Sequence, residues 1–172
     1  MVNAGISGNL LLTDYPCYAG DAGISRFTRD VLDQPGVRTA IVLQAANDLG
    51  IGGIDVGCAK PPVVTAAHLV NGYRTLIQAA HARGVTVIGA TVTPLKGSGP
   101  YYDTTYNEGV RTEVNHWIRT SGEYDAVVDL DRVLADPADP DALLPAYNSG
   151  DNLHVNDAGM RAIAAAIEPH IR

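Results

Sequence analysis

The chain has 172 residues, of which 46% are apolar, so it can bury one ordinary core and is expected to form a single domain over residues 1–172. Its formal net charge of -7 argues against a nucleic acid or an anionic membrane as a partner. It contains no run of 18 apolar residues, and it opens inside a predicted strand. We therefore expect neither a transmembrane segment nor a signal peptide in this chain.

Apolar runs without alternation are separated by segments with helical periodicity. This pattern predicts a parallel sheet that is covered by helices on both faces. Thr65 is a plausible N-cap, and Pro35-Gly36 and Gly84 are expected to stop helices. In chain order we expect a strand over 2–6, a helix over 24–32, a strand over 39–43, a helix between Thr65 and Gly84, a strand within 85–93, a helix around 110–118, a strand over 124–129, a short helix near 131–134 and a last helix from about Asn156.

Polar clusters occur at three equivalent places along this pattern. Ser7-Gly8-Asn9 follows the first predicted strand, Asn47-Asp48 follows the second, and Asp151 and His154 lie in the loop after the last strand. In an open α/β sheet, ligands bind in the crevice at the carboxyl ends of the strands. The three clusters are therefore expected to meet in one site.

These residue types fit acyl transfer. An imidazole that is oriented by a carboxylate acts as a general base, which assigns those roles to His154 and Asp151. Acyl transfer also needs donors that point at the developing oxyanion. The backbone N–H of Gly8 and the side-chain amide of Asn47 are the candidates for this oxyanion site.

The segments Val2–Asn9, Ile41–Asp48 and Asp151–Asn156 resemble the second, third and fifth sequence blocks of the SGNH hydrolases, also called GDSL esterases and lipases. The resemblance covers nearly the whole chain. It implies a three-layer α/β/α fold with a flavodoxin-like parallel sheet, and ester hydrolysis without a metal or cofactor. It also implies that Gly8 and Asn47 are oxyanion donors and that Asp151 and His154 belong to a catalytic triad.

The chain departs from the family pattern at two places. The third block usually has glycine two residues before the asparagine, where this chain has Ala45, and this change is expected to narrow the floor of the pocket. The Gly-Asp-Ser block that carries the family's nucleophile does not occur in the 172 residues. The family's first strand is therefore expected to be missing or replaced, which leaves a gap in the sheet or closes the sheet up.

Ser7 is the best-placed substitute nucleophile, because it lies beside Gly8 at the expected catalytic edge. The other candidates are helical or loop residues, and none lies in a G-x-S-x-G elbow. They are Ser25, Ser98, Ser121 and Ser149.

Two cysteines, Cys17 and Cys58, lie in loops that follow strands, so they can either form a disulfide or remain as two buried thiols. A disulfide, together with the family resemblance, would suggest a secreted protein.

The resulting hypothesis is a short-chain or acetyl carboxylesterase that acts on a small-molecule ester through an acyl-enzyme. The alternative is an inactive SGNH-like protein whose oxyanion cleft binds ligand without turnover. A homo-oligomer in which one protomer covers the open sheet of another is a third expectation.

Overall fold

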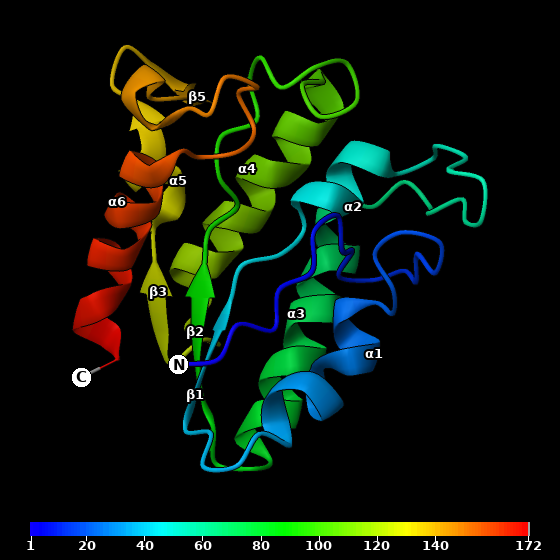
Figure 1. Ribbon diagram of the computed structural model, residues 1–172, viewed down its shortest axis with the longest axis vertical. Helices are drawn as coiled ribbons and strands as arrows, with labels where there is room; N and C mark the ends of the chain where they lie inside the picture. The colour runs from blue at the N-terminus through cyan, green and yellow to red at the C-terminus, as the bar shows by residue number, and fades with distance from the viewer. Residues whose placement is uncertain (172) are drawn as a thin grey trace.

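The computed structural model describes residues 1–171 and shows a parallel sheet between two layers of helices (Figure 1). In this sheet the strand order is β1-β2-β3, and both neighbouring pairs are parallel. The elements are α1 (Gly23–Phe27), η1 (Thr28–Leu32), β1 (Thr39–Val42), α2 (Ala46–Ile51), α3 (Ala66–His81), β2 (Thr86–Ala90), α4 (Thr105–Thr120), β3 (Ala126–Val128), α5 (Leu130–Leu134), β4 (Ala135–Asp136), β5 (Asp139–Leu143), η2 (Pro145–Tyr147), α6 (Asp157–Ile167) and η3 (Glu168–His170).

The two faces of the sheet bury different helices, because successive side chains of a strand point to opposite faces. Val42 and Val87 face the larger core, which includes the buried sides of α3 and α4. Ile88 and Val128 face a smaller core, against which α5 and α6 pack. The predicted three-layer α/β/α arrangement with a parallel sheet is therefore confirmed.

The predicted strand over residues 2–6 is wrong. These residues form no backbone ladder, and Val2 is 71% exposed. A strand is stabilised by hydrogen bonds to a neighbouring strand, and β1 pairs only with β2 in the described chain. The segment is held instead from the side, where Nη1 of Arg26 donates a 2.6 Å hydrogen bond to the carbonyl of Ala4.

Two stretches that were predicted to be irregular loops contain regular secondary structure. The expected Gly-rich loop after residue 47 begins with the helix α2, and the polar loop before Asp151 contains the antiparallel pair β4-β5. Both elements are short, so they provide too few residues for periodicity to reveal them. No helix within residues 1–171 is both long enough and apolar enough to cross a membrane.

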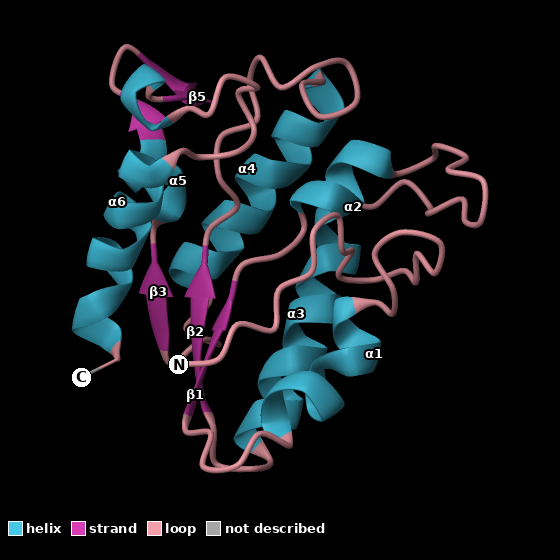
Figure 2. Ribbon diagram, viewed as in Figure 1, coloured by secondary structure: helices cyan, strands magenta, loops and turns pink. Residues whose placement is uncertain are grey.

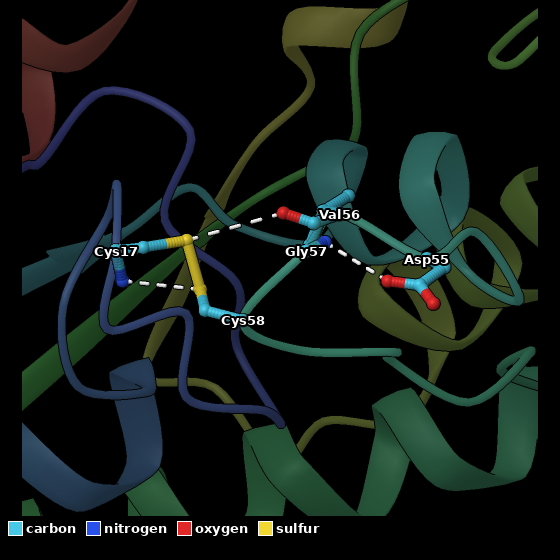
Figure 3. Close-up of a disulfide and its surroundings, with 5 residues drawn as sticks. All are labelled: Cys17, Asp55, Val56, Gly57 and Cys58. Carbon is cyan, nitrogen blue, oxygen red and sulfur yellow. Dashed lines mark hydrogen bonds between the residues drawn. A yellow bond between two sulfur atoms is a disulfide. The ribbon is translucent and has the colours of Figure 1, made fainter.

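Long loops gather beyond the carboxyl ends of the strands (Figure 2), and a disulfide joins two of them. Cys17 and Cys58 are bonded, with their Cα atoms 6.0 Å apart. The N–H of Cys17 also lies 3.2 Å from Sγ of Cys58 (Figure 3). Of the two alternatives for these cysteines, the disulfide is therefore the one observed.

Replacing both cysteines by serine is expected to lower the free energy of unfolding by about 2 to 4 kcal/mol. The bond joins residues separated by 41 positions, so its loss returns conformational freedom to a long loop of the unfolded chain. Urea unfolding of the parent and the double serine variant measures this difference. Equal stabilities would show that the two loops are held by their other contacts.

Candidate active site

Asp151 and His154 form a hydrogen-bonded pair in the loop before α6. Oδ2 of Asp151 lies 2.7 Å from Nδ1 of His154, and Oδ1 accepts the backbone N–H groups of Leu153 and His154 at 3.0 and 2.8 Å. The hydrogen bond from His154, followed by those from the two amides, holds the pKa of Asp151 well below its usual range. The carboxylate therefore stays ionised at neutral pH and orients the imidazole.

Three asparagines fix the shape of this loop. Oδ1 of Asn148 accepts the amides of Gly150 and Asn152 at 2.8 and 3.0 Å, which forms a tight turn. Asn152 adopts a φ of 59°, a left-handed conformation that asparagine tolerates better than most residues. Oδ1 of Asn156 accepts the first amides of α6, while its Nδ2 donates to the carbonyl of Asn148 at 3.1 Å. The loop is thus tied to the helix that follows it.

Gly8 lies in a turn in which the N–H of Asn9 donates to the carbonyl of Ile6 at 3.2 Å. Its φ of 72° is open to glycine and strained for other residues. A Cβ atom at this position would lie 2.5 Å from the ring of Tyr18, so the ring packs directly against the glycine. No acceptor within residues 1–171 takes the N–H of Gly8, which leaves this donor available to a ligand.

Asn47 lies in the first turn of α2, and its amide is held at both ends. Nδ2 donates to the carbonyl of Asn9 at 3.1 Å, and Oδ1 accepts the hydroxyl of Tyr102 at 3.0 Å. Because a backbone carbonyl can only accept, the first bond fixes which end of the amide is NH₂. One N–H of this group remains for a ligand next to Gly8.

The side chain of Asn9 lies beneath this arrangement and is only 2% exposed. Its Nδ2 donates to the carbonyls of Ala19 and Asp21, both at 2.8 Å, and its Oδ1 accepts two hydrogen bonds from Arg26 at 3.1 and 2.8 Å. Asn9 therefore connects the Gly8 turn, the following loop and α1. Sequence reasoning placed Asn9 in a motif but assigned no role to it. For Tyr102 it weighed a pocket-lining role and favoured loop packing, and it did not expect the hydrogen bond to Asn47.

Ala45 precedes α2 at the position where a glycine was expected. It is buried and has a φ of 91°, so an L-residue occupies a conformation that favours glycine. Its methyl group belongs to the larger core, behind α2.

Asp48 fastens α2 to the chain after Gly8. Its two carboxylate oxygens accept the N–H groups of Leu11 and Leu12 at 2.8 and 3.0 Å, although the residue is almost fully buried. Burial raises the pKa of Asp48 to about 6, and the hydrogen bonds from the two amides oppose this increase. A side chain that the sequence placed in the site is thus an internal brace.

The contribution of Asp48 to stability is expected to fall as the pH rises from about 4 to about 7. The pKa in the folded state is above the ordinary value of 3.8, so the folded chain binds the proton more tightly, and this advantage disappears above pH 6. Between pH 4 and pH 7, the free energy of unfolding of the Asp48→Asn variant should therefore rise by about 3 kcal/mol relative to that of the parent. Urea unfolding at pH 4, 5, 6 and 7 measures the difference, and a constant difference would contradict the assignment.

The loop over residues 95–103 contacts both halves of the site. Nδ2 of Asn152 donates to the carbonyl of Gly97 at 3.1 Å, and Tyr102 on the same loop reaches Asn47. Tyr102 packs so closely on Gly50 that a Cβ atom there would lie 2.1 Å from its ring. A cavity of about 240 Å³ lies beside this contact, with mainly apolar walls that include Leu49, Ile54, Val63, Val64 and Pro100.

The candidate serines are scattered. Ser7 is exposed in the turn before Gly8, and within the described chain no hydrogen bond joins it to His154. Ser149 donates to Oδ1 of Asp151 at 3.2 Å. The imidazole of His154 contacts the other carboxylate oxygen, Oδ2. Ser98 donates to the carbonyl of Leu95. The structure thus pairs Asp151 with His154, and it bonds Asn47 to the carbonyl of Asn9, the residue after Gly8. Across residues 1–171, no cluster of three or more His, Cys, Asp or Glu side chains is arranged to hold a metal ion.

Solved structures with similar folds belong to acylhydrolases and esterases. One is a putative acylhydrolase from Bacteroides fragilis, with a TM-score of 0.68 and 17% identity, over 86% of this chain and 67% of that chain. An acetyl xylan esterase, AlAXEase, has a TM-score of 0.68 and 18% identity, over 98% and 79% of the two chains. TesA has a TM-score of 0.62 and 19% identity, over 99% and 77%. At these identities the likeness shows the fold alone.

No curated protein matches the chain. A family model does match, and it describes the GDSL-like lipase/acylhydrolase family and covers residues 1–162. The match spans the Gly8 turn, the start of α2 and the Asp151–His154 loop. The chain therefore belongs to the GDSL-like lipase/acylhydrolase family.

Proposed function

We propose that the chain hydrolyses carboxylic esters with small acyl groups, such as acetyl. The observation that carries this proposal is the 2.7 Å contact between Asp151 and Nδ1 of His154. It leaves Nε2 of His154 without a partner among residues 1–171, so this nitrogen is available to take a proton. An oriented imidazole of this kind is the general base of serine hydrolases.

The proposed nucleophile within this chain is Ser7. His154 takes the hydroxyl proton as Oγ of Ser7 attacks the ester carbonyl, and the N–H of Gly8 and Nδ2 of Asn47 donate to the oxyanion. The imidazolium then protonates the leaving alcohol. Water, deprotonated by His154, hydrolyses the acyl-enzyme and restores Ser7. This chemistry requires neither a metal nor a cofactor.

The preference for small acyl groups is supported by the cavity next to Tyr102, which at about 240 Å³ has room for a short apolar group. Its position behind Gly50, one turn along α2 from Asn47, suits the acyl side of the ester. One structural neighbour is an acetyl xylan esterase, and its name is compatible with a small acyl group.

A second candidate function is ligand binding without turnover. Two observations favour it. Ser7 and His154 are not hydrogen-bonded in the described chain, and Gly-Asp-Ser does not occur in the 172 residues. In that case the Gly8 and Asn47 donors would bind a carbonyl or carboxylate oxygen that is not attacked.

Labelling with a fluorophosphonate, read by intact and peptide mass spectrometry, separates the two functions. The ester hydrolase predicts one adduct on Ser7, lost in both Ser7→Ala and His154→Ala and retained in Ser149→Ala. An adduct on another serine would move the nucleophile to that residue. No adduct on folded parent protein would reject the hydrolase and favour the binding function.

A further inference from the structure

An exposed tyrosine packs directly against Gly8, one of the two proposed oxyanion donors. The ring of Tyr18 packs against Gly8 along the edge that carries Cδ1 and Cε1, yet the residue is 67% exposed. Aromatic rings are usually buried because of their large apolar area. Here much of the ring surface is open to solvent beside Gly8, the residue whose N–H is a proposed oxyanion donor.

The backbone holds this ring in place. The carbonyl of Tyr15 accepts the N–H groups of Tyr18, Ala19 and Gly20 at 3.1, 2.8 and 2.9 Å, which closes a tight loop. The ring of Tyr15 lies 5.6 Å from that of Tyr18 and supports it from one side. Cys17, the residue before Tyr18, is covalently bonded to the loop of Cys58 (Figure 3). The position of the ring is therefore built into the fold.

A second tyrosine, Tyr102, contacts the other proposed oxyanion donor. Burial raises the pKa of Tyr102, and the negative charge of an ionised Tyr18 raises it further. Tyr102 donates its own hydroxyl to Oδ1 of Asn47 at 3.0 Å. The open ring of Tyr18 thus lies against Gly8, one proposed oxyanion donor, while Tyr102 binds Asn47, the other.

We propose that Tyr18 is a substrate-binding residue that stacks on a flat six-membered ring in the alcohol part of the ester. This inference rests on the proposed ester hydrolysis and adds the class of alcohol. Sugars and arenes both meet this requirement, because each presents a flat face, made of C–H groups in a sugar and of π electrons in an arene. The acyl group takes the apolar cavity behind Gly50, and the alcohol ring lies on Tyr18.

The physical reason is the geometry of aromatic contacts. A rigid ring stacked on tyrosine keeps its contact area with little loss of conformational entropy, whereas a linear alkyl chain has no flat face and must be ordered. Stacking of this kind contributes roughly a 2- to 12-fold increase in affinity. The effect is therefore expected in KM, with kcat nearly unchanged.

The test compares Tyr18→Phe, Tyr18→Leu and Tyr18→Ala with the parent. Phenylalanine keeps the aromatic ring. Leucine keeps an apolar side chain packed against Gly8 but offers no flat face for stacking. With an acetylated methyl xylopyranoside and with phenyl acetate, KM should rise roughly 2- to 12-fold in the leucine and alanine variants and stay near the parent value in phenylalanine. With butyl acetate, KM should change little in any variant.

Several outcomes decide the proposal. A rise for the sugar ester alone or for phenyl acetate alone identifies the type of ring and supports stacking. Equal losses for butyl acetate would overturn it, because Tyr18 would then act only as structural cover for Gly8. Unchanged KM values for both ring esters in leucine and alanine would also overturn it.

A binding experiment keeps the inference separate from the proposed hydrolysis. Methyl xylopyranoside and benzyl alcohol carry no ester, and their binding is followed through the backbone amide shifts of Gly8 and Ala19 in the parent and the three variants. Binding that is lost in leucine and alanine and kept in phenylalanine would support stacking even if no ester is hydrolysed. Ring binding that is equally strong in the parent and in the leucine and alanine variants would reject the stacking proposal, whether or not an ester is hydrolysed.

Discussion

The His154→Ala variant is expected to lower kcat for hydrolysis of a short-chain aryl ester by about 10²- to 10⁴-fold, the range typical of general acid–base catalysis. The imidazole is held at 2.7 Å by Asp151, and no other residue of the described chain is placed to replace it at this position. In the proposed mechanism, its loss removes both the base that activates the nucleophile and the acid that protonates the leaving alcohol. Stopped assays with p-nitrophenyl acetate measure the effect against the background hydrolysis.

His116→Ala is the matched control, because His116 is exposed on α4 and its side chain makes no hydrogen bond within residues 1–171. This variant should keep the parent kcat. Full activity in His154→Ala would remove His154 from the mechanism. Equal losses in both variants would point to a general effect of the substitutions on folding.

Asn9→Ala is expected to lower the free energy of unfolding by about 3 to 5 kcal/mol, since it leaves a buried charge without one of its partners. The side chain makes four hydrogen bonds while 2% exposed, and two of them come from the buried guanidinium of Arg26. Alanine would leave the carbonyls of Ala19 and Asp21 without these donors. Urea unfolding monitored by circular dichroism provides the measurement.

The control for this effect is Asn71→Ala, an exposed position on α3, where a change within about 0.5 kcal/mol is expected. A second variant, Asn9→Asp, keeps acceptors for Arg26 but removes the donors to the two carbonyls, so its stability should lie between those of parent and alanine. If Asn9→Ala were as stable as the parent, Arg26 must find other partners beyond Ala4 and Asp30.

Helices with a regular repeat of apolar residues were predictable from the sequence, because such a repeat reflects the burial of one helix face. The helices α3 and α4 have repeated apolar positions and capping threonines at Thr65 and Thr104, and both form as long helices. The parallel sheet followed from its non-alternating apolar strands. Local pattern was enough at these places because each element carries its own signal.

The residues 2–6 show where this reasoning fails. Their apolar run matches a buried strand, but strand formation requires a neighbour with a free hydrogen-bonding edge at the right distance. The segment lies instead beside Arg26, with Val2 exposed. Whether a short apolar run becomes a strand was therefore decided by what lies next to it in space.

By itself, the sequence determined the types of residues in the site and their order along the chain: Gly8, Asn47, Asp151 and His154. Tertiary structure decided which of the candidate polar side chains bond to one another and which brace the fold. It buried Asp48 on two backbone amides, oriented Asn47 between Asn9 and Tyr102, and placed Tyr18 over Gly8. These outcomes depend on hydrogen bonds and ring contacts between segments far apart in the chain, for which no local sequence pattern exists.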